Sequence, residues 1–460
     1  MVVVQAIMTP EEMAAVDSAA PEPVEVLVER AGGAVARAAL DLLGGAYGRR
    51  VVVLAGRGNN GADGRAAARR LEARGVRCRV IDAADAPTVL PAADLVIDAA
   101  YGTGFRGRFD PPALPASPPP VLAVDIPSGI SGLTGEASGR PWTAARTVAF
   151  AAWKPGLLLA GGPELAGEVT VADIGLDVSG ARAHLVRGAD VADWLPDRPR
   201  AAHKWRAAVW VVAGSPGMTG AAHLATRAAP RAGAGYVRLS TPGSDLDPAA
   251  PPEAVVTALP SEGWASEVLE GLSRFGALAV GPGLGTDAGH GAQVRDLVAG
   301  STVPVVVDGD GLRALGPDAA AVIGRRPAGA ALVVLTPHDG EFEALTGAAP
   351  GADRFAAVRN LAARTGAVVL LKGPTTLVAD PSGHVWASTS GDARLATAGA
   401  GDVLTGTIAA LLAQGVAPDS AAAAGAHLHG RAGALAWRRG LVAGDLVEHL
   451  PAALAELPGG

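Results

Sequence analysis

Short, continuously apolar runs recur along the chain and alternate with longer stretches in which Ala, Leu and Arg follow a helical spacing. Such Val-rich runs are typical of strands in a parallel sheet that is covered on both faces. The runs lie at Val51–Ala55, Leu95–Asp98, Val121–Asp125, Val209–Ala213, Ala277–Val280, Val303–Asp308, Leu332–Thr336 and Val368–Leu371. Alternation of strands and helices over the whole length predicts a layered α/β fold.

Two complete α/β patterns follow one another, separated by a stretch that contains prolines and mixed charges. This stretch, GADVADWLPDRPRA, covers Gly188–Ala201. We therefore predict two domains, at residues 1–191 and 201–460, with a linker near Ala192–Arg200. The length of 460 residues agrees, because single hydrophobic cores stop growing at about 250–300 residues. A second proline-rich stretch, Pro111–Pro120, is interpreted as a surface loop.

Composition and charge exclude several classes of protein. With 49% hydrophobic and 18% charged residues, the chain is globular rather than disordered. The net charge of −7 and the scattered Arg residues argue against a nucleic-acid partner. The single cysteine, Cys78, excludes an internal disulfide framework and a Cys-based zinc site. Since we find no signal peptide and no apolar run of transmembrane length, we expect a cytoplasmic protein with no membrane partner.

A glycine-rich loop follows the first strand of the N-terminal half. Gly56–Gly61 reads GRGNNG and matches the G-x-G-x-x-G spacing, and Asp82 ends the next strand, where a dinucleotide-binding acid would contact ribose. A plain strand–helix turn explains the glycines alone about equally well. However, Asn59, Asn60 and Asp63 add side-chain oxygens at a helix N-terminus that could bind ribose, nicotinamide or a cation.

Two further strands of this half end on an acid. Asp98 precedes the segment YGTGFRG, and Asp125 precedes IPSG with Ser128. Because ligands bind at the carboxyl ends of strands in doubly wound sheets, Asn60, Asp98, Asp125 and Ser128 are expected to meet there. Each acid alone could instead cap a helix.

The segments GRGNNGADG, DAAYGTGFRG, VDIPSG and AFAAWKPGL together resemble the NAD(P)H-hydrate epimerase domain of the YjeF N-terminal type, over about residues 1–180. The resemblance implies a Rossmann-like three-layer αβα domain, acid/base catalysis by Asp125, and a potassium ion held by Asn60, Asp98 and Ser128. It implies that the hydrated nucleotide is bound by Asn59, Asn60, Gly61, Ala62, Asp63, Gly102, Thr103, Gly104, Phe105, Arg106, Gly107 and Arg108. Ala62 departs from the glycine usual in this family.

In the second half, the segment AGAGDVLTG at Ala398–Gly406 leads from a glycine turn into an apolar helix, Val403–Leu412. The backbone N–H groups and the helix dipole would face an anion. Asp402, in the first turn, could take a proton from a substrate hydroxyl, an arrangement that suits phosphoryl transfer. The alternative is an Asp that merely caps a core helix.

Polar and glycine-rich segments follow several other strands of this half. They are Gly281–Gly285, Asp308–Gly311, Thr336–Glu341 and Lys372–Thr376. The chain has only three lysines, Lys154, Lys204 and Lys372, and all lie in motif segments. Because Arg is used elsewhere, these positions indicate a need for a compact ammonium group. We expect His338 to contact substrate, and His427 and His429 to be structural.

This half is similar to the ADP/ATP-dependent NAD(P)H-hydrate dehydratases, which have a ribokinase-like αβα fold, over about residues 200–455. The segments that carry the likeness are VWVVAGSPGMTGAAHLATRAAPRAGAGYVRL, GPGLG, VVVDGDGL, LTPHDGEFEAL, LLKGPTTLVA and TAGAGDVLTGTIAALLAQG. The resemblance implies phosphorylation of the C6 hydroxyl followed by elimination of phosphate, with Mg²⁺ and with ADP favoured over ATP. It implies nucleotide contacts from Lys372, Gly373, Pro374, Thr375, Thr376 and Gly401, and substrate contacts from Ala221, Gly283, His338 and the catalytic Asp402. HKWRAA, Ala400 and DGDGL depart from the family pattern.

The two halves imply one bifunctional repair enzyme, because an epimerase supplies the epimer that the dehydratase consumes. We expect NADHX and NADPHX as substrates and a homo-oligomer as the assembly. Three alternatives remain open. A ribokinase-like small-molecule kinase fits Gly399–Asp402 equally well, and a NAD-dependent dehydrogenase would rest on Gly56–Gly61 and Asp82. The N-terminal half could also bind without catalysing, an option that Ala62 keeps open.

Overall fold

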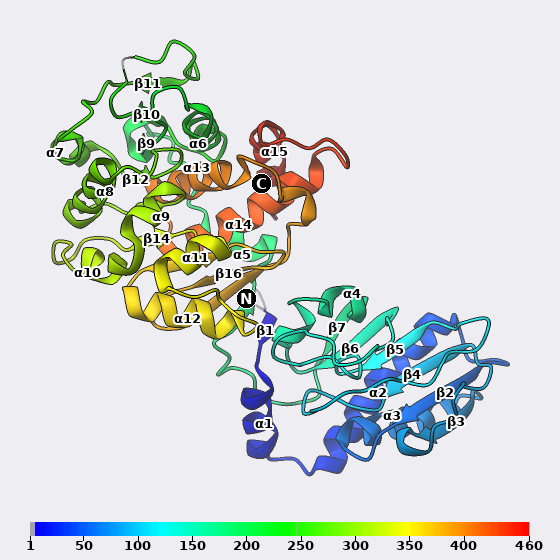
Figure 1. The fold of residues 1–460 in the computed structure, drawn as a ribbon. Coiled ribbons are helices and arrows are strands. Elements are labelled where there is room, and N and C mark those ends of the chain that lie inside the picture. The colour runs from blue at the N-terminus through cyan, green and yellow to red at the C-terminus, as the bar shows by residue number, and fades with distance from the viewer. Residues whose placement is uncertain (1–4, 245, 460) are drawn as a thin grey trace. The chain divides into compact units, whose positions relative to one another are not determined.

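The computed structural model describes residues 5–244 and 246–459 and divides into two compact units (Figure 1). One unit spans Gln5–Ala183 and the other begins at His184, which is earlier than the predicted limits of 191 and 201. The reason is local. Val186 N donates to Ala387 O at 2.9 Å, and helix α5 (Gly188–Trp194) packs on helix α14 (Pro418–Leu435). Residues 184–194 are therefore part of the second unit.

The N-terminal unit contains a parallel sheet in the order β3-β2-β4-β5-β6-β7. Its strands are β2 (Arg50–Ala55), β3 (Arg77–Asp82), β4 (Leu95–Ala99), β5 (Val121–Val124), β6 (Arg146–Phe150) and β7 (Glu168–Ala172). After β3 the chain returns to the other side of β2, so the strand order reverses between β2 and β4. The carboxyl ends of these two strands are where a doubly wound sheet forms its ligand crevice.

The two faces of this sheet are covered differently. Helices α2 (Val24–Leu43) and α3 (Asn59–Glu72) pack together on one face over a core of Ala, Val and Leu. The other face is covered by the short α4 (Gly162–Ala166) and by irregular segments that include residues 111–120. The predicted α/β class is confirmed, but this second helical layer is reduced, because a proline-rich segment cannot supply helical N–H donors. The chain begins with β1 (Gln5–Ile7) and α1 (Pro10–Ala19).

The second unit contains a longer sheet, in the order β8-β17-β16-β15-β14-β13-β12-β9-β10-β11. Pairing is parallel from β11 to β15 and antiparallel from β15 to β17. Its strands are β8 (Ala183–Leu185), β9 (Ala208–Val212), β10 (Tyr236–Ser240), β11 (Ala254–Val256), β12 (Ala277–Val280), β13 (Val305–Val307), β14 (Val333–Leu335), β15 (Val368–Leu371), β16 (Thr376–Ala379) and β17 (Val385–Ser388). The strand order reverses between β9 and β12.

Helices cover both faces of this sheet (Figure 1). One layer holds α6 (Gly220–Arg231), α13 (Ala400–Ala413), α14 (Pro418–Leu435) and α15 (Ala443–Ala455). The opposite layer holds α7 (Trp264–Gly271), α8 (Ala288–Gly300), α9 (Asp310–Leu315), α10 (Ala319–Ile323), α11 (Asp339–Thr346) and α12 (Arg354–Thr365). This is the predicted three-layer αβα arrangement. Within the described part of the chain, no helix is both long and apolar enough to cross a membrane.

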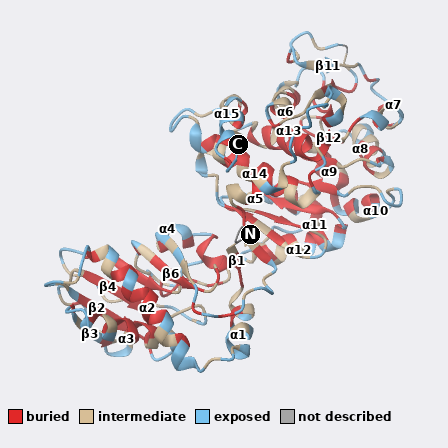
Figure 2. Cartoon of the chain, turned by 180° about the vertical axis from the view of Figure 1, so that it is seen from behind, coloured by how far each residue is buried: buried red, intermediate tan, exposed pale blue. Residues whose placement is uncertain are grey.

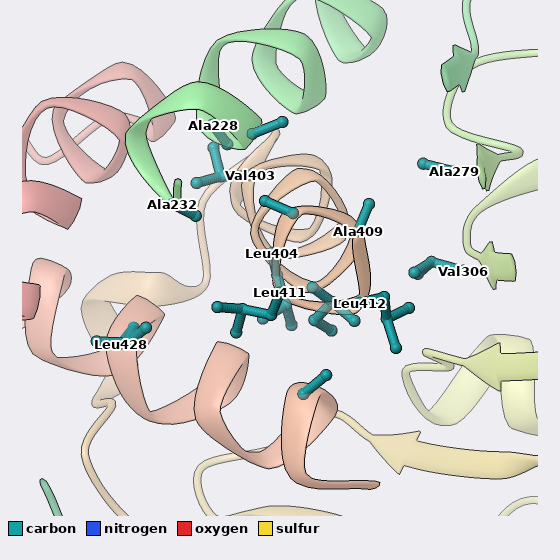
Figure 3. Close-up of a cluster of buried hydrophobic side chains, with 14 of the residues drawn as sticks. Ala228, Ala232, Ala279, Val306, Val403, Leu404, Ala409, Leu411, Leu412 and Leu428 are labelled. Carbon is teal, nitrogen blue, oxygen red and sulfur yellow. The ribbon is translucent and has the colours of Figure 1, made fainter. Parts of the chain in front are cut away.

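The core of the second unit is centred on α13, where Leu404, Leu411 and Leu412 lie among side chains of α6, α14 and the sheet (Figure 3). Buried residues follow the strands and the inner helix faces in both units (Figure 2). Small residues let the backbones approach closely: a Cβ on Gly406 would lie 2.0 Å from Ala225 O of α6. The middle of α13 therefore packs closely against α6.

Candidate functional sites

A cleft of about 900 Å³ opens at the carboxyl ends of β2 and β4, where the strand order reverses. Most of the residues predicted for the nucleotide loop line it. These are Asn59, Asn60, Asp63, Gly102, Thr103, Gly104 and Phe105, and the predicted catalytic residue Asp125 lines the cleft as well. The structure thus brings Asp125 and Asn60, which are far apart in sequence, into one cleft.

The glycines of the first loop permit a tight strand–helix turn. A Cβ on Gly61 would lie 1.9 Å from Gly56 O, so the backbone approach requires glycine at this position. Asn60 follows the turn and lies over Gly102, whose Cβ would be 3.4 Å from Asn60 Oδ1. Asn60 Nδ2 is buried with no hydrogen-bond partner, which points to a ligand, because an unpaired buried donor costs about 1–3 kcal/mol.

Asp125 follows β5 with a left-handed backbone, φ +67°, which is uncommon for a residue with a side chain. Its carboxylate accepts a hydrogen bond from Lys154 Nζ at 2.5 Å, and this ammonium also donates to Phe150 O at 2.9 Å. The Lys154 side chain is only 2% exposed. Backbone strain of this kind is typical of active sites, and here it turns a carboxylate toward a buried cation.

Two more acids line the same cleft, Asp17 on α1 and Asp63 on α3. Burial, with Asp125 and Asp17 nearby, raises the pKa of Asp63 to about 8. Burial and Asp125 also raise the pKa of Asp17, while Lys154 lowers it. Asp63 therefore keeps its proton at neutral pH. The cleft combines a neutral acid with a carboxylate that is paired with a lysine, so it can both supply and accept a proton.

Of the three residues predicted to hold potassium, Asp98 and Ser128 form one hydrogen-bonded unit. Asp98 accepts from Ser128 Oγ at 2.6 Å and from Ser128 N at 2.9 Å, and Tyr101 N donates to Ser128 Oγ at 2.9 Å. Burial raises the pKa of Asp98. Asp98 and Ser128 offer oxygen atoms of the kind that a hard cation binds. The unpartnered Nδ2 of Asn60 is a donor and points instead to an acceptor atom of a ligand.

Several predicted residues do not line the cleft. Gly61 is buried in the turn, and Ala62 N donates to Gly58 O at 3.1 Å within the first turn of α3. Arg106, Gly107 and Arg108 are exposed outside the cleft, where Arg108 pairs with Asp110 at 2.8 Å. The methyl group of Ala62 therefore does not enter the cleft.

The second site lies at the start of α13. Gly399 caps this helix with φ +88° and no side-chain hydrogen bond. Ala400 N donates to Thr397 O at 3.2 Å, so the N–H groups of Gly401 and Asp402 are the ones that can face an anion. Asp402 lies in the first turn. Burial and then Asp308 raise the pKa of Asp402 to about 6, against the opposing effect of Lys372. A carboxylate with this pKa can act as a base near neutral pH.

Lys372 reaches this helix start from the end of β15. Its ammonium pairs with Asp308 Oδ1 at 2.5 Å and lies 3.9 Å from Glu341 Oε2. A Cβ on Gly401 would be 3.2 Å from Lys372 Nζ, so the lysine touches the glycine turn. Burial lowers the pKa of Lys372. The nearby Asp308 and Glu341 outweigh this effect, so the pKa of Lys372 is raised. A cation, an anion-binding turn and a base therefore meet here.

The predicted substrate residues Ala221 and Gly283 lie together at the reversal between β9 and β12. A Cβ on Gly283 would be 3.3 Å from Ala221 Cβ, and Gly214 N donates to Pro282 O at 2.7 Å. His338 is exposed and caps α11, with Nδ1 accepting from Gly340 N at 3.1 Å. Its Nε2 lies 3.3 Å from Glu341 Oε1, so both ring nitrogens contact residues of α11.

The segment Lys372–Thr376 forms the turn of an antiparallel hairpin between β15 and β16, rather than a strand–helix loop. Gly373 and Pro374 are exposed, Thr375 is buried, and Thr376 Oγ1 donates to Gly373 O at 3.4 Å. The turn thus presents its backbone beside Lys372.

His427 and His429 lie in α14, and His427 Nδ1 and His429 Nε2 are buried without a hydrogen-bond partner. The structural role expected for them stays a prediction. Burial lowers the pKa of each to about 4, so both are neutral.

The sequence interpretation did not assign Lys154, Asp17, Asp308 or Glu341 to either site. It singled out Lys154 as one of three lysines in motif segments, but it did not link this lysine to Asp125. Asp308 and Glu341 lie in the motifs DGDG and TPHDGE, but their ion pairs with Lys372 join segments far apart in sequence. Asp17 lies on α1 in no motif, and no sequence signal singles it out.

The fold and the two sites define a two-unit α/β enzyme. Its N-terminal unit has a cleft at the strand reversal, and its second unit has a cluster of charged side chains at the start of α13. Comparisons with known proteins identify the class. Residues 209–455 match the family model of NAD(P)H-hydrate dehydratase, and residues 24–89 and 81–156 match the model of the YjeF-related protein N-terminus.

Relatives match over nearly the whole length. A bifunctional NAD(P)H-hydrate repair enzyme Nnr of Moorella thermoacetica is 36% identical over 98% of this chain and 97% of its own. The protein of the same name from Mycobacterium tuberculosis is 40% identical over 83% of this chain and 82% of its own. The chain therefore belongs to the family of bifunctional NAD(P)H-hydrate repair enzymes.

Solved structures agree for the second unit. The ADP/ATP-dependent NAD(P)H-hydrate dehydratase from Bacillus subtilis, co-crystallized with ATP/Mg²⁺, is 28% identical with a TM-score of 0.50. It covers 59% of this chain and 98% of its own. A ribokinase-like superfamily protein from Enterococcus faecalis, 23% identical with a TM-score of 0.53, covers 62% of this chain and 99% of its own and supports the fold alone.

Proposed function

We propose that this protein repairs hydrated NAD(P)H at two sites. The N-terminal cleft interconverts the R and S epimers of NADHX and NADPHX. The second site dehydrates the S epimer to NAD(P)H at the expense of ADP or ATP, and with ADP the products are AMP and phosphate. The observation that carries the proposal is the meeting of Asp402, Lys372 and the open start of α13, because it joins a base to an anion pocket.

At the second site, Asp402 takes the proton of the C6 hydroxyl as its oxygen attacks the terminal phosphorus of the nucleotide. The N–H groups at Gly401 and the ammonium of Lys372 stabilise charge on the transferred phosphoryl group. Loss of a C5 proton and of the C6 phosphate then forms the ring double bond. This assigns Lys372–Thr376 and Gly401 to the nucleotide, and Ala221, Gly283 and His338 to the hydrated substrate.

Magnesium would assist by neutralising phosphate charge when it is bound with the nucleotide. The B. subtilis structure, co-crystallized with ATP/Mg²⁺, supports this pairing. We favour ADP over ATP for this chain.

At the N-terminal cleft, inversion at C6 needs removal of one proton and return of another. Asp125 is the acid/base residue, and the hydrogen bond from Lys154 Nζ orients its carboxylate. The predicted ligands Asn60, Asp98 and Ser128 would hold potassium beside the substrate. Asn60 would bind the ion through Oδ1, which leaves its buried, unpartnered Nδ2 to donate to an acceptor atom of the substrate. Replacing potassium by a bulky organic cation in the buffer should lower epimerisation but not dehydration.

The test is to incubate purified protein with the S epimer, Mg²⁺ and either ADP or ATP, and to follow reduced nicotinamide absorbance together with free phosphate. Repair predicts that NADH and phosphate appear in equal amounts. A ribokinase-like kinase, the alternative that Gly399–Asp402 also fits, would give a stable phosphorylated product and no free phosphate.

A further inference from the structure

Asp308 lies at the end of β13, between the two elements that form the anion pocket. Its side chain is 3% exposed, and each carboxylate oxygen has a partner from a different element. Oδ1 pairs with Lys372 Nζ of the β15 end at 2.5 Å, and Oδ2 accepts from Thr405 Oγ1 of α13 at 2.7 Å. One buried carboxylate thus links the lysine to the helix that carries Asp402.

The contact with Thr405 involves a choice of acceptor. Thr405 Oγ1 has one proton and lies 3.1 Å from Gly401 O as well as 2.7 Å from Asp308 Oδ2. The carboxylate is the stronger acceptor, because hydrogen bonds to ionised groups are about twice as strong as neutral ones. The Thr405 proton therefore goes to Asp308, and the second turn of α13 is tied to the end of β13.

The backbone of Asp308 is fixed as well. Gly281, with φ +123°, passes so close that a Cβ there would lie 2.0 Å from Asp308 O. Asp308 N donates to Val280 O at 3.2 Å. A carboxylate on a backbone held by neighbouring strands is suited to fix the position of a mobile lysine.

Asp308 also contributes to the charge around Asp402. The charged groups that act on Asp402 come from four elements: Asp308 after β13, Asp310 of α9, Glu341 of α11 and Lys372 after β15. Asp308 is the largest of these after burial, and it raises the pKa of Asp402, whereas Lys372 lowers it. Removing the charge of Asp308 should therefore favour the ionised form of Asp402.

We infer that Asp308 is a positioning residue of the dehydratase site, which fixes the Lys372 ammonium against the first turn of α13 and tunes the charge around Asp402. The inference rests on the proposed function, because it assigns a role within the nucleotide pocket. Asp308 acts through Lys372, Thr405 and Asp402.

The test is the pH profile of dehydration by Asp308→Asn, an isosteric change that removes the charge. The expected result is a loss in kcat on the order of 10²-fold, since misplacing reacting groups by 1 Å can cost that much. The acidic limb of the profile should move to lower pH, because the influence that raises the pKa of Asp402 is gone. Epimerisation by the same chain serves as the internal control and should not change.

A second pair of variants separates the helix tie from the charge. Thr405→Val removes the hydroxyl but keeps Asp308 charged, so kcat should fall while the acidic limb stays in place; Thr405→Ser should retain the rate. If Asp308→Asn shows no cooperative thermal unfolding of the second unit and therefore does not fold there, this pair decides the matter: equal rates for Val and Ser would overturn the inference.

Other results would also overturn it. If the acidic limb of the Asp308→Asn profile did not move, Asp308 would be a packing residue only. The same would follow if this variant dehydrated the substrate within twofold of the rate of the original chain. Failure of the proposed function looks different, because then the unaltered chain restores no NADH at all.

Discussion

Asp63 and Asp125 are two carboxyl groups that line the same cleft but have different electrostatic surroundings. Asp125 is paired with the buried Lys154, whereas burial and the neighbouring acids raise the pKa of Asp63 to about 8. Pairs of titratable groups separated in this way divide the roles of acid and base between them. The division has consequences for stability that can be measured without substrate.

Asp63 should make the N-terminal unit less stable as the pH rises. The pKa of Asp63 is higher in the folded protein than the usual 3.8, so the folded state binds a proton that the unfolded state lacks between about pH 4 and 8. The contribution of Asp63 to the free energy of unfolding is therefore full below pH 4 and is lost as the pH passes 8. In Asp63→Asn the fall in Tm over this window should shrink by a few degrees, because about 1 kcal/mol shifts Tm by roughly 2–4 °C in a unit of this size. Parallel Tm–pH curves for the two proteins would contradict the assignment.

Lys154 should matter for both folding and epimerisation. Lys154→Met leaves the Asp125 charge unpaired, and breaking a buried pair costs about 3–5 kcal/mol. Epimerisation should fall by on the order of 10² or more, as for loss of an acid/base group. The matched control is Lys204→Met, since Lys204 is exposed and lies over the Tyr236 ring. Urea unfolding and epimer interconversion measure both effects; equal behaviour of the two variants would rule out this role.

Asp402 should govern the pH dependence of dehydration. Its active form as a base is ionised, and its pKa is raised to about 6, so kcat should rise as the pH passes through 6. Asp402→Asn should abolish restoration of NADH while epimer interconversion persists. The measurement is NADH formation across pH 5–8 in both proteins, and a flat profile for the unaltered chain would count against the assignment.

Among the elements, the turn between β2 and α3 shows how close packing dictates sequence. A Cβ on Gly61 would lie 1.9 Å from Gly56 O, whereas a Cβ on Gly58 meets no atom within 4 Å. The two glycines of one motif therefore serve different purposes. Gly61 lets the helix start against the strand, and Gly58 stands exposed at the entrance of α3.

Gly61→Ala should displace the loop that carries Asn59 and Asn60 and should lower both Tm and epimerisation. Gly58→Ala, which meets no steric obstacle, should keep the fold. Thermal unfolding followed by circular dichroism, together with an epimerisation assay, compares the two. A Gly61→Ala protein as stable and active as Gly58→Ala would show that the turn tolerates a side chain.

The elements also show what could be predicted from sequence. The apolar runs located the strands, such as Val368–Leu371, and the AGAGD turn located α13, because both follow from local periodicity and glycine. The hairpin after Lys372 was not predicted, since a strand of four residues carries little sign of its direction. The reduced helical layer on the N-terminal sheet was not predicted either, although Pro111–Pro120 was interpreted correctly as a loop.

At the scale of the whole molecule, the chain divides into two units, and each has its own pocket residues. The predicted convergence of Asp125 with Asn60, and of Asp402 with Lys372, follows from strand order, because carboxyl ends of parallel strands lie on one sheet edge. Ion pairs such as Lys154–Asp125 and Lys372–Asp308 could not be predicted from sequence. They depend on the side-chain positions of segments 29 and 64 residues apart.

The most direct test of the two-site account is incubation of the purified chain with a mixture of both hydrate epimers, Mg²⁺ and excess ADP. The account predicts that the unaltered protein restores all of the hydrate to NADH. Asp125→Ala should rapidly restore only the share present as the S epimer and then slow sharply. If Asp125→Ala restored both epimers as fast as the unaltered chain, or if neither protein restored any NADH, the account would be contradicted.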